Sequence, residues 1–125
     1  MDKTTNVAVC SRSFSKNPFL RAELLKRYKN VKFNDEGVSL NGASLISFLN
    51  GQDYAIIALE VINDEVLSQL PKLKVIGKYG VGLDKLDFKA LNKHKIRLGW
   101  TPGVNSQAVA ELALCLSLTI VRRTN

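Results

Sequence analysis

Residues 74–111 read KVIGKYGVGLDKLDFKALNKHKIRLGWTPGVNSQAVAE, and this stretch decides the fold of the chain. A buried strand is predicted at 75–77, where apolar residues run into closely spaced glycines. A helix capped by Asp87 follows, and a second short strand covers 96–98. Strands and helices that alternate in this way are typical of a parallel sheet with crossover helices. The stretch therefore predicts an α/β fold.

The same alternation extends back to the N-terminus. Asn17 and Pro18 are typical of a helix start, because an asparagine cap is followed by proline at the first helical position. The run YAIIAL at 54–59 is apolar throughout, which indicates a central strand. The expected strands cover 7–10, 31–33, 54–59, 75–77 and 96–98, with helices from Pro18, around 45–49, from Asn63 to Pro71 and from Asp87. These elements predict a flavodoxin-like parallel five-stranded sheet with crossover helices over residues 1–99.

A long apolar helix is predicted at residues 106–123, after the sheet. Between residues 108 and 121 the single charge is Glu111. The helix is shorter than the roughly 20 residues that cross a bilayer, so we expect no membrane partner. A helix that is apolar on nearly all sides is normally covered by other elements. Because one five-stranded sheet cannot cover both apolar faces, we expect a homodimer that pairs or exchanges this helix.

The composition is that of an ordinary soluble domain. The chain has 125 residues, 46% hydrophobic and 23% charged, which is enough for one domain with a core. Cys10 and Cys115 lie in separate apolar runs, which favours buried, reduced thiols and a cytoplasmic location. The net charge of +7 is not accompanied by a nucleic-acid recognition motif. We therefore expect a solvated basic face and no nucleic-acid partner.

The glycine turn formed by Tyr79, Gly80, Val81 and Gly82 is the first candidate site. Glycines after a parallel strand allow a sharp turn that points successive backbone N–H groups into the crevice where open α/β sheets bind ligands. Such a turn can bind a small anion. A tight strand-to-helix turn without a ligand explains the same residues, and the residues alone favour this second interpretation.

Three charged residues near the turn are expected to have structural roles. Asp84 and Asp87 could form an acid–base pair or bind a metal. Asp87 is better explained as a helix cap, and Asp84 as a side chain that stabilises the turn. His94, the single histidine, ends a helix, where a cation is favoured. We therefore assign no catalytic residue and no metal ligand.

The pattern GxxGxGxD at 77–84, followed by TPGxNSxxVAE at 101–111, resembles the D-isomer-specific 2-hydroxyacid dehydrogenases. The phosphoglycerate dehydrogenase-like and glyoxylate/hydroxypyruvate reductase-like members are the most similar. The resemblance is specific from 70 to 123 and weaker before that. It implies that the chain is the substrate-binding front part of such an enzyme. Residues 100–125 would then be an interdomain crossing and the first helix of a truncated, nucleotide-binding Rossmann domain.

The resemblance also implies roles in substrate binding. The main-chain amides of residues 79–82 would hold the substrate carboxylate. Asn105 would lie beside the substrate, although Asn105 or Ser106 could also cap the last helix. The substrate is expected to be a small 2-hydroxy or 2-oxo acid. Members that act on phosphorylated substrates tend to carry basic residues after the third strand, where this chain has Leu59 and Glu60, so we expect no phosphate group.

Hydride transfer in this family uses NAD or NADP. The family's GxGxxG loop and its catalytic arginine, carboxylate and histidine have no match in the sequence, and His94 does not correspond to the catalytic histidine. We therefore expect neither tight coenzyme binding nor turnover by this chain alone. The alternative is a stand-alone, non-catalytic domain, derived from the family, that binds a small anion or has a regulatory function.

Overall fold

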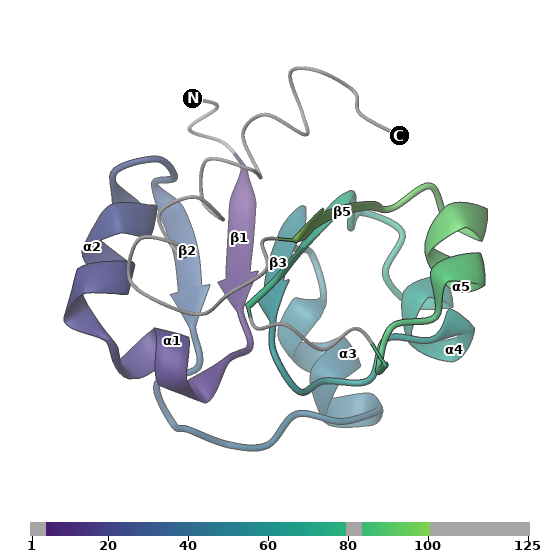
Figure 1. Cartoon of the computed structure of the whole chain (residues 1–125), viewed down its shortest axis with the longest axis horizontal. Helices are drawn as coiled ribbons and strands as arrows, with labels where there is room; N and C mark the ends of the chain where they lie inside the picture. Colours follow the sequence, from purple (N-terminus) through teal and green to yellow (C-terminus); the bar gives the residue numbers. More distant parts are fainter. Residues whose placement is uncertain (1–4, 80–83, 101–125) are drawn as a thin grey trace.

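The computed structural model describes residues 5–79 and 84–100. Within these ranges five parallel strands form one sheet in the order β2-β1-β3-β4-β5, with helices on both faces (Figure 1). This arrangement is that of the flavodoxin-like fold, which confirms the expected fold class. In chain order the elements are β1 (Asn6–Val9), α1 (Arg12–Lys16), α2 (Pro18–Leu25), β2 (Asn30–Phe33), α3 (Ala43–Leu49), β3 (Tyr54–Ile57), α4 (Asp64–Ser68), β4 (Val75–Lys78), α5 (Phe88–Lys93) and β5 (Arg97–Trp100).

Each face of the sheet carries its own hydrophobic core. Successive side chains of a strand point to opposite faces. Val7 and Val9 of β1 therefore pack with Phe14 of α1 and Leu24 of α2, whereas Ala8 belongs to the core beneath α3, α4 and α5. Because both faces are covered, the inner strands are buried on both sides and read as nearly continuous apolar runs.

The strand β3 is central, as the sequence predicted. It pairs with β1 on one side and with β4 on the other, and all four of its residues are buried. The strand ends at Ile57, before the expected Leu59, because the chain turns where the Ala58 N–H donates to the Glu60 carboxylate at 2.7 Å. The side chain of Leu59 is consequently 66% exposed. The expected end of this strand was wrong.

Side-chain caps begin three helices where the sequence placed them. The side-chain oxygens of Asn17, Asn63 and Asp87 accept hydrogen bonds from backbone N–H groups in the first turns of α2, α4 and α5. Gly51 follows α3 with a φ of +80°, a left-handed conformation that suits glycine after a helix. These local signals are therefore confirmed.

The helix α1 was not predicted from the sequence. It reads RSFSK, with Phe14 as its one large apolar side chain, so a helical periodicity could not show. Contacts with distant residues hold it in place. Phe14 is buried, and the Ser15 hydroxyl accepts a hydrogen bond from the Asn34 N–H at 3.0 Å. Asn17 ends α1 and begins α2.

Some expectations concern residues outside the described ranges. These are the helix at 106–123, the surroundings of Cys115 and the crossing that follows β5. Cys10 is described and is a buried free thiol, as expected. In the part of the chain that the structure describes, no helix is long and apolar enough to cross a membrane.

Candidate functional site

A pocket lies at the carboxyl edge of the sheet, next to the ends of β1, β3 and β4. Neighbouring parallel strands end at the same edge, and open α/β sheets bind ligands there. The pocket, which we call the carboxyl-edge pocket, has a volume of about 350 Å³. Its lining residues are Ser11, Arg12, Ser13, Ser39, Leu40, Asn41, Ala58, Leu59, Glu60 and Tyr79.

Tyr79 links this pocket to the glycine turn. It is the first residue of the turn, and its backbone N–H donates to the Ile57 carbonyl at 2.8 Å, which holds the start of the turn against the end of β3. Its ring packs edge-on against Phe14 of α1, with ring centroids 5.4 Å apart. The remaining expected site residues lie outside the described ranges, so their roles stay predictions: Gly80, Val81, Gly82 and Asn105.

The pocket wall after β1 is polar. The Ser11 and Ser13 hydroxyls lie 3.3 Å apart, and Ser11 also accepts a hydrogen bond from the Phe14 N–H. The Arg12 side chain is exposed and forms no hydrogen bond or ion pair with the described residues. A guanidinium in this state is available to a carboxylate or another anion. Sequence reasoning missed this residue, although the polar run SRS directly after an apolar strand was a usable signal.

Two charged side chains are buried beside the pocket. Glu60 follows β3 and is 8% exposed, and Lys78 ends β4 and is 5% exposed. Burial lowers the pKa of Lys78 below its ordinary value, and the negative charge of Glu60 partly offsets that shift. Burial, followed by the charge of Glu60, raises the pKa of Cys10 well above its usual range. The Cys10 thiol therefore stays protonated and is poorly suited to act as a nucleophile.

Asp84, Asp87 and His94 were expected to have structural roles, and the structure describes all three. Asp87 caps α5, and Asp84 is exposed. His94 ends α5, and its Nε2 lies 2.7 Å from Oδ1 of Asp64 at the start of α4. The hydrogen bond with His94, followed by that with Lys93, lowers the pKa of Asp64. Among the described residues, no group of histidine, cysteine and acidic side chains could hold a metal ion.

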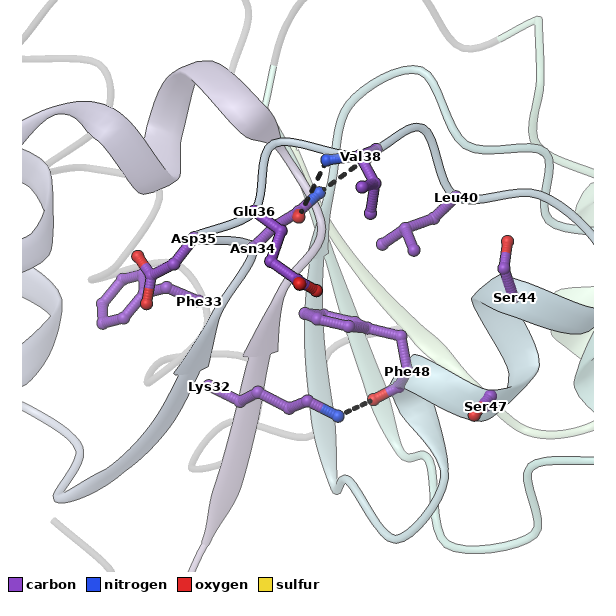
Figure 2. Close-up of a pocket in the computed structure, with 10 residues that line it drawn as sticks. All are labelled: Lys32, Phe33, Asn34, Asp35, Glu36, Val38, Leu40, Ser44, Ser47 and Phe48. Atoms are coloured by element: carbon purple, nitrogen blue, oxygen red, sulfur yellow. Dashed lines mark hydrogen bonds between the residues drawn. The ribbon is translucent and has the colours of Figure 1, made fainter.

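A second pocket, the Asn34 pocket, has a volume of about 380 Å³ and lies between the end of β2 and α3 (Figure 2). The Asn34 side chain donates to the carbonyls of Cys10 and Val38 and accepts from the Val38 N–H. Lys32 donates to the Phe48 carbonyl at 3.1 Å, and its ammonium lies over the Phe48 ring. These groups already have partners in the protein, so we assign no ligand to this pocket.

Comparison with known proteins identifies the family. The family model described as D-isomer specific 2-hydroxyacid dehydrogenase, catalytic domain, matches residues 7–121. The chain belongs to this family. The resemblance expected from the glycine turn and the TPG loop is therefore confirmed.

Similar members of the D-2-hydroxyacid dehydrogenase family include enzymes with named activities. The chain is 32% identical to a glyoxylate reductase of Thermococcus litoralis over 99 residues, which are 79% of this chain and 28% of that protein. A crystal structure described as a D-isomer specific 2-hydroxyacid dehydrogenase, NAD-binding, from Polaromonas is 32% identical, with a TM-score of 0.72. The match covers 92% of this chain and 35% of the Polaromonas chain.

A more distant member shows the same fold. It is the 3-phosphoglycerate dehydrogenase of Entamoeba histolytica, solved with bound NAD+, which is 22% identical with a TM-score of 0.61. That match covers 92% of this chain and 38% of the other. The chain thus spans about a third of the length of the family members that it matches.

Proposed function

We propose that this chain is the substrate-binding portion of an NAD(P)-dependent D-2-hydroxyacid dehydrogenase. The observation that carries the proposal is the carboxyl-edge pocket, which adjoins Tyr79 at the start of the glycine turn. In the intact enzyme the reaction would be hydride transfer between a small 2-hydroxy acid and a nicotinamide coenzyme. The similarity to a glyoxylate reductase supports a small 2-oxo acid as the ligand of this chain.

The contribution of this chain would be to bind and orient the substrate. The Tyr79 N–H already donates to the Ile57 carbonyl, so of the expected amides at 79–82 those of residues 80–82 would hold the carboxylate, because successive amides in a turn form an anion site. The rest of the substrate would then face the pocket wall that contains Arg12 and Leu59. Fixing the reacting carbon in this way lowers the entropic part of the barrier. The arginine that orients the substrate and the histidine that transfers the proton would come from the coenzyme domain.

The described residues do not fit a dinucleotide. A dinucleotide-binding fold carries a glycine-rich turn after its first strand, at a helix N-terminus. Here β1 is followed by CSRSF at 10–14, without glycine, and the Phe14 N–H already donates to the Ser11 hydroxyl at 3.2 Å. We therefore propose that the chain alone neither binds NAD(H) tightly nor transfers hydride. Turnover by the purified chain with coenzyme and a panel of D-2-hydroxy acids would contradict this.

An NMR titration tests the binding site. Glyoxylate or pyruvate at millimolar concentration should shift the backbone amide signals of residues 79–82 and of Arg12. Gly80→Val should abolish these shifts, because a branched side chain does not suit a turn that relies on glycine. Ala22→Val, at an exposed position of α2, is the control and should leave them unchanged. Shifts confined to other regions of the wild-type chain, or none, would disprove the proposed site.

We also propose a second copy of this chain as a partner, through the helix predicted at 106–123, which lies outside the described residues. The basis is its sequence, which is apolar on opposite faces and would leave a large apolar patch in water. Replacing Leu114 and Leu118 with lysine should shift the chain toward monomer and leave its circular dichroism unchanged. Sedimentation of the unmodified chain as a monomer at tens of micromolar would rule the dimer out.

A further inference from the structure

Two buried charges hold the backbone of a single residue at the end of β3. The Ala58 N–H donates to Oε1 of Glu60 at 2.7 Å, and the Ala58 carbonyl accepts a hydrogen bond from the Lys78 ammonium. Both charged side chains are nearly inaccessible to water. Both polar backbone groups of Ala58 are thus bound by charged side chains rather than by the backbone of a neighbouring strand.

The sheet itself does not require this arrangement. Burying a charge is unfavourable unless the charge is paired and hydrogen-bonded, and Glu and Lys are among the residues that are least often buried. Water or a neutral side chain could satisfy the backbone of a loop residue at a lower cost. A pair of buried charges at one loop residue therefore points to a role in addition to folding.

The pair lies where the substrate would bind. Ala58, Glu60 and Tyr79 line the carboxyl-edge pocket, and Lys78 immediately precedes Tyr79. The Tyr79 N–H donates to the Ile57 carbonyl, and the Lys78 side chain donates to the next carbonyl, that of Ala58. Two successive residues at the end of β4 are thus bonded to two successive carbonyls at the end of β3. The start of the glycine turn is fixed to β3 at both points.

Lys78 acts through the backbone rather than on the ligand. Its ammonium donates to the Ala58 carbonyl, and its side chain does not line the pocket, whereas Arg12 does. Glu60 does line the pocket, and its negative charge would repel an anionic substrate if no cation opposed it. The positive charge of Lys78 opposes it, since the two charges are close enough for Glu60 to raise the pKa of Lys78 against the effect of burial.

We propose that Glu60 and Lys78 are positioning residues that together fix the ends of β3 and β4, so that the glycine turn is set to receive the carboxylate of a small 2-oxo acid. This inference rests on the proposed function of the turn. It assigns no contact with the substrate to Lys78. It predicts that the two charges matter for ligand binding even when the stability of the fold is restored without them.

Three variants of the chain test the proposal. Lys78→Met keeps an unbranched side chain of nearly the same length and removes the charge. The double variant Glu60→Gln with Lys78→Met removes both charges and keeps an amide oxygen for the Ala58 N–H. Lys74→Met, at an exposed position just before β4, is the matched control. The measurements are hydrogen exchange of the Tyr79 amide without ligand, urea unfolding, and the dissociation constant for glyoxylate by NMR.

In Lys78→Met, exchange of the Tyr79 amide should accelerate about tenfold, and the glyoxylate dissociation constant should rise about tenfold. The double variant should regain most of the stability that the single variant loses, because no buried charge is left unpaired. It should keep the weakened glyoxylate binding. Lys74→Met should match the wild type in all three measurements.

Two results would overturn the proposal. One is a double variant that binds glyoxylate as tightly as the wild type, and the other is an unchanged exchange rate of the Tyr79 amide in Lys78→Met. If the wild-type chain shows no glyoxylate shifts at all, the proposed function of the turn fails instead. The exchange rate of Tyr79 then decides by itself whether the pair fixes the turn.

Discussion

Two pockets lie near the carboxyl edge of the same sheet, and Leu40 lines both of them. Their volumes are similar, about 380 and 350 Å³. In the Asn34 pocket the polar side chains of Asn34 and Lys32 are bonded to the backbone. In the carboxyl-edge pocket the Arg12 side chain forms no hydrogen bond or ion pair with a described residue. The two pockets therefore differ in whether these polar side chains already have partners, and not in volume.

The largest effect should come from Asn34→Ala, which removes hydrogen bonds from the Asn34 pocket. The substitution leaves the buried Cys10 carbonyl without this partner and removes both hydrogen bonds between the Asn34 side chain and the backbone of Val38. We expect the free energy of unfolding to fall by about 2–4 kcal/mol, measured by urea denaturation. Ser47→Ala, at an exposed position of the same pocket, should change it by less than about 0.5 kcal/mol. Equal effects of the two substitutions would show that the hydrogen bonds of Asn34 do not stabilise the fold.

The next effect should come from Arg12→Ala in the carboxyl-edge pocket. Stability should stay within about 0.5 kcal/mol of the wild type, because the side chain is exposed and has no described partner. The affinity for glyoxylate should fall about tenfold, since a charge-assisted hydrogen bond to the ligand is lost. Lys16→Ala, on the same helix but outside the pocket, should not change the affinity. A loss of stability without a loss of affinity would reverse the roles of the two pockets.

A smaller effect is expected for Leu59→Arg, which adds a free cation to the carboxyl-edge pocket. Leu59 is 66% exposed and lines the pocket after β3. The affinity for 3-phosphoglycerate should rise about threefold, because an exposed ion pair contributes little in water. The affinity for pyruvate should change less than that for 3-phosphoglycerate, and added salt should remove the gain. An equal gain for both ligands would show that the cation attracts anions without selecting phosphate.

The smallest effect should come from a substitution of Asp64, an exposed side chain that already has hydrogen-bond partners. Hydrogen bonds from His94 and then Lys93 hold its pKa below the ordinary value of about 3.9. Its contribution to stability is therefore present above that pH and is lost as the pH falls through the folded-state pKa. Urea midpoints should be slightly lower for Asp64→Asn than for the wild type at pH 6. The difference should shrink as the pH falls through the folded-state pKa of Asp64.

Glu36→Gln is the control for that series. Its side chain is exposed, and the substitution removes one negative charge, as Asp64→Asn does. It should therefore show the general effect of net charge without the effect of the hydrogen bond to His94. If the urea midpoints of both variants depend on pH in the same way, the hydrogen bond between Asp64 and His94 contributes nothing measurable to stability.

Local signals predicted most of the fold. Asn17, Asn63 and Asp87 cap helices because the features that make a cap lie within a few residues of one another. The central place of β3 followed from its unbroken apolar run. The helix α1 escaped prediction because the contacts that stabilise it, such as the bond between Ser15 and Asn34, join residues far apart in the sequence.

The site was predictable only in part, for a related reason. Tyr79 was predicted as a site residue because glycines mark the turn that it begins, and it lines the pocket, while its role in binding stays a prediction. Arg12 is beside Leu59 and Tyr79 only because the strand order brings the ends of β1, β3 and β4 together. The burial of Lys78 also depends on that order, and lysine is normally exposed. Tertiary placement of this kind leaves no periodic trace in the sequence.

The strand order also governs how the sheet can be made during synthesis. In the order β2-β1-β3-β4-β5, each strand from β3 onward joins an edge that is still free when it leaves the ribosome. No strand has to insert between two that are already paired. The described lining of the carboxyl-edge pocket ends at Tyr79, so these walls leave the ribosome before β5 does. These described walls can therefore assemble before the sheet is complete.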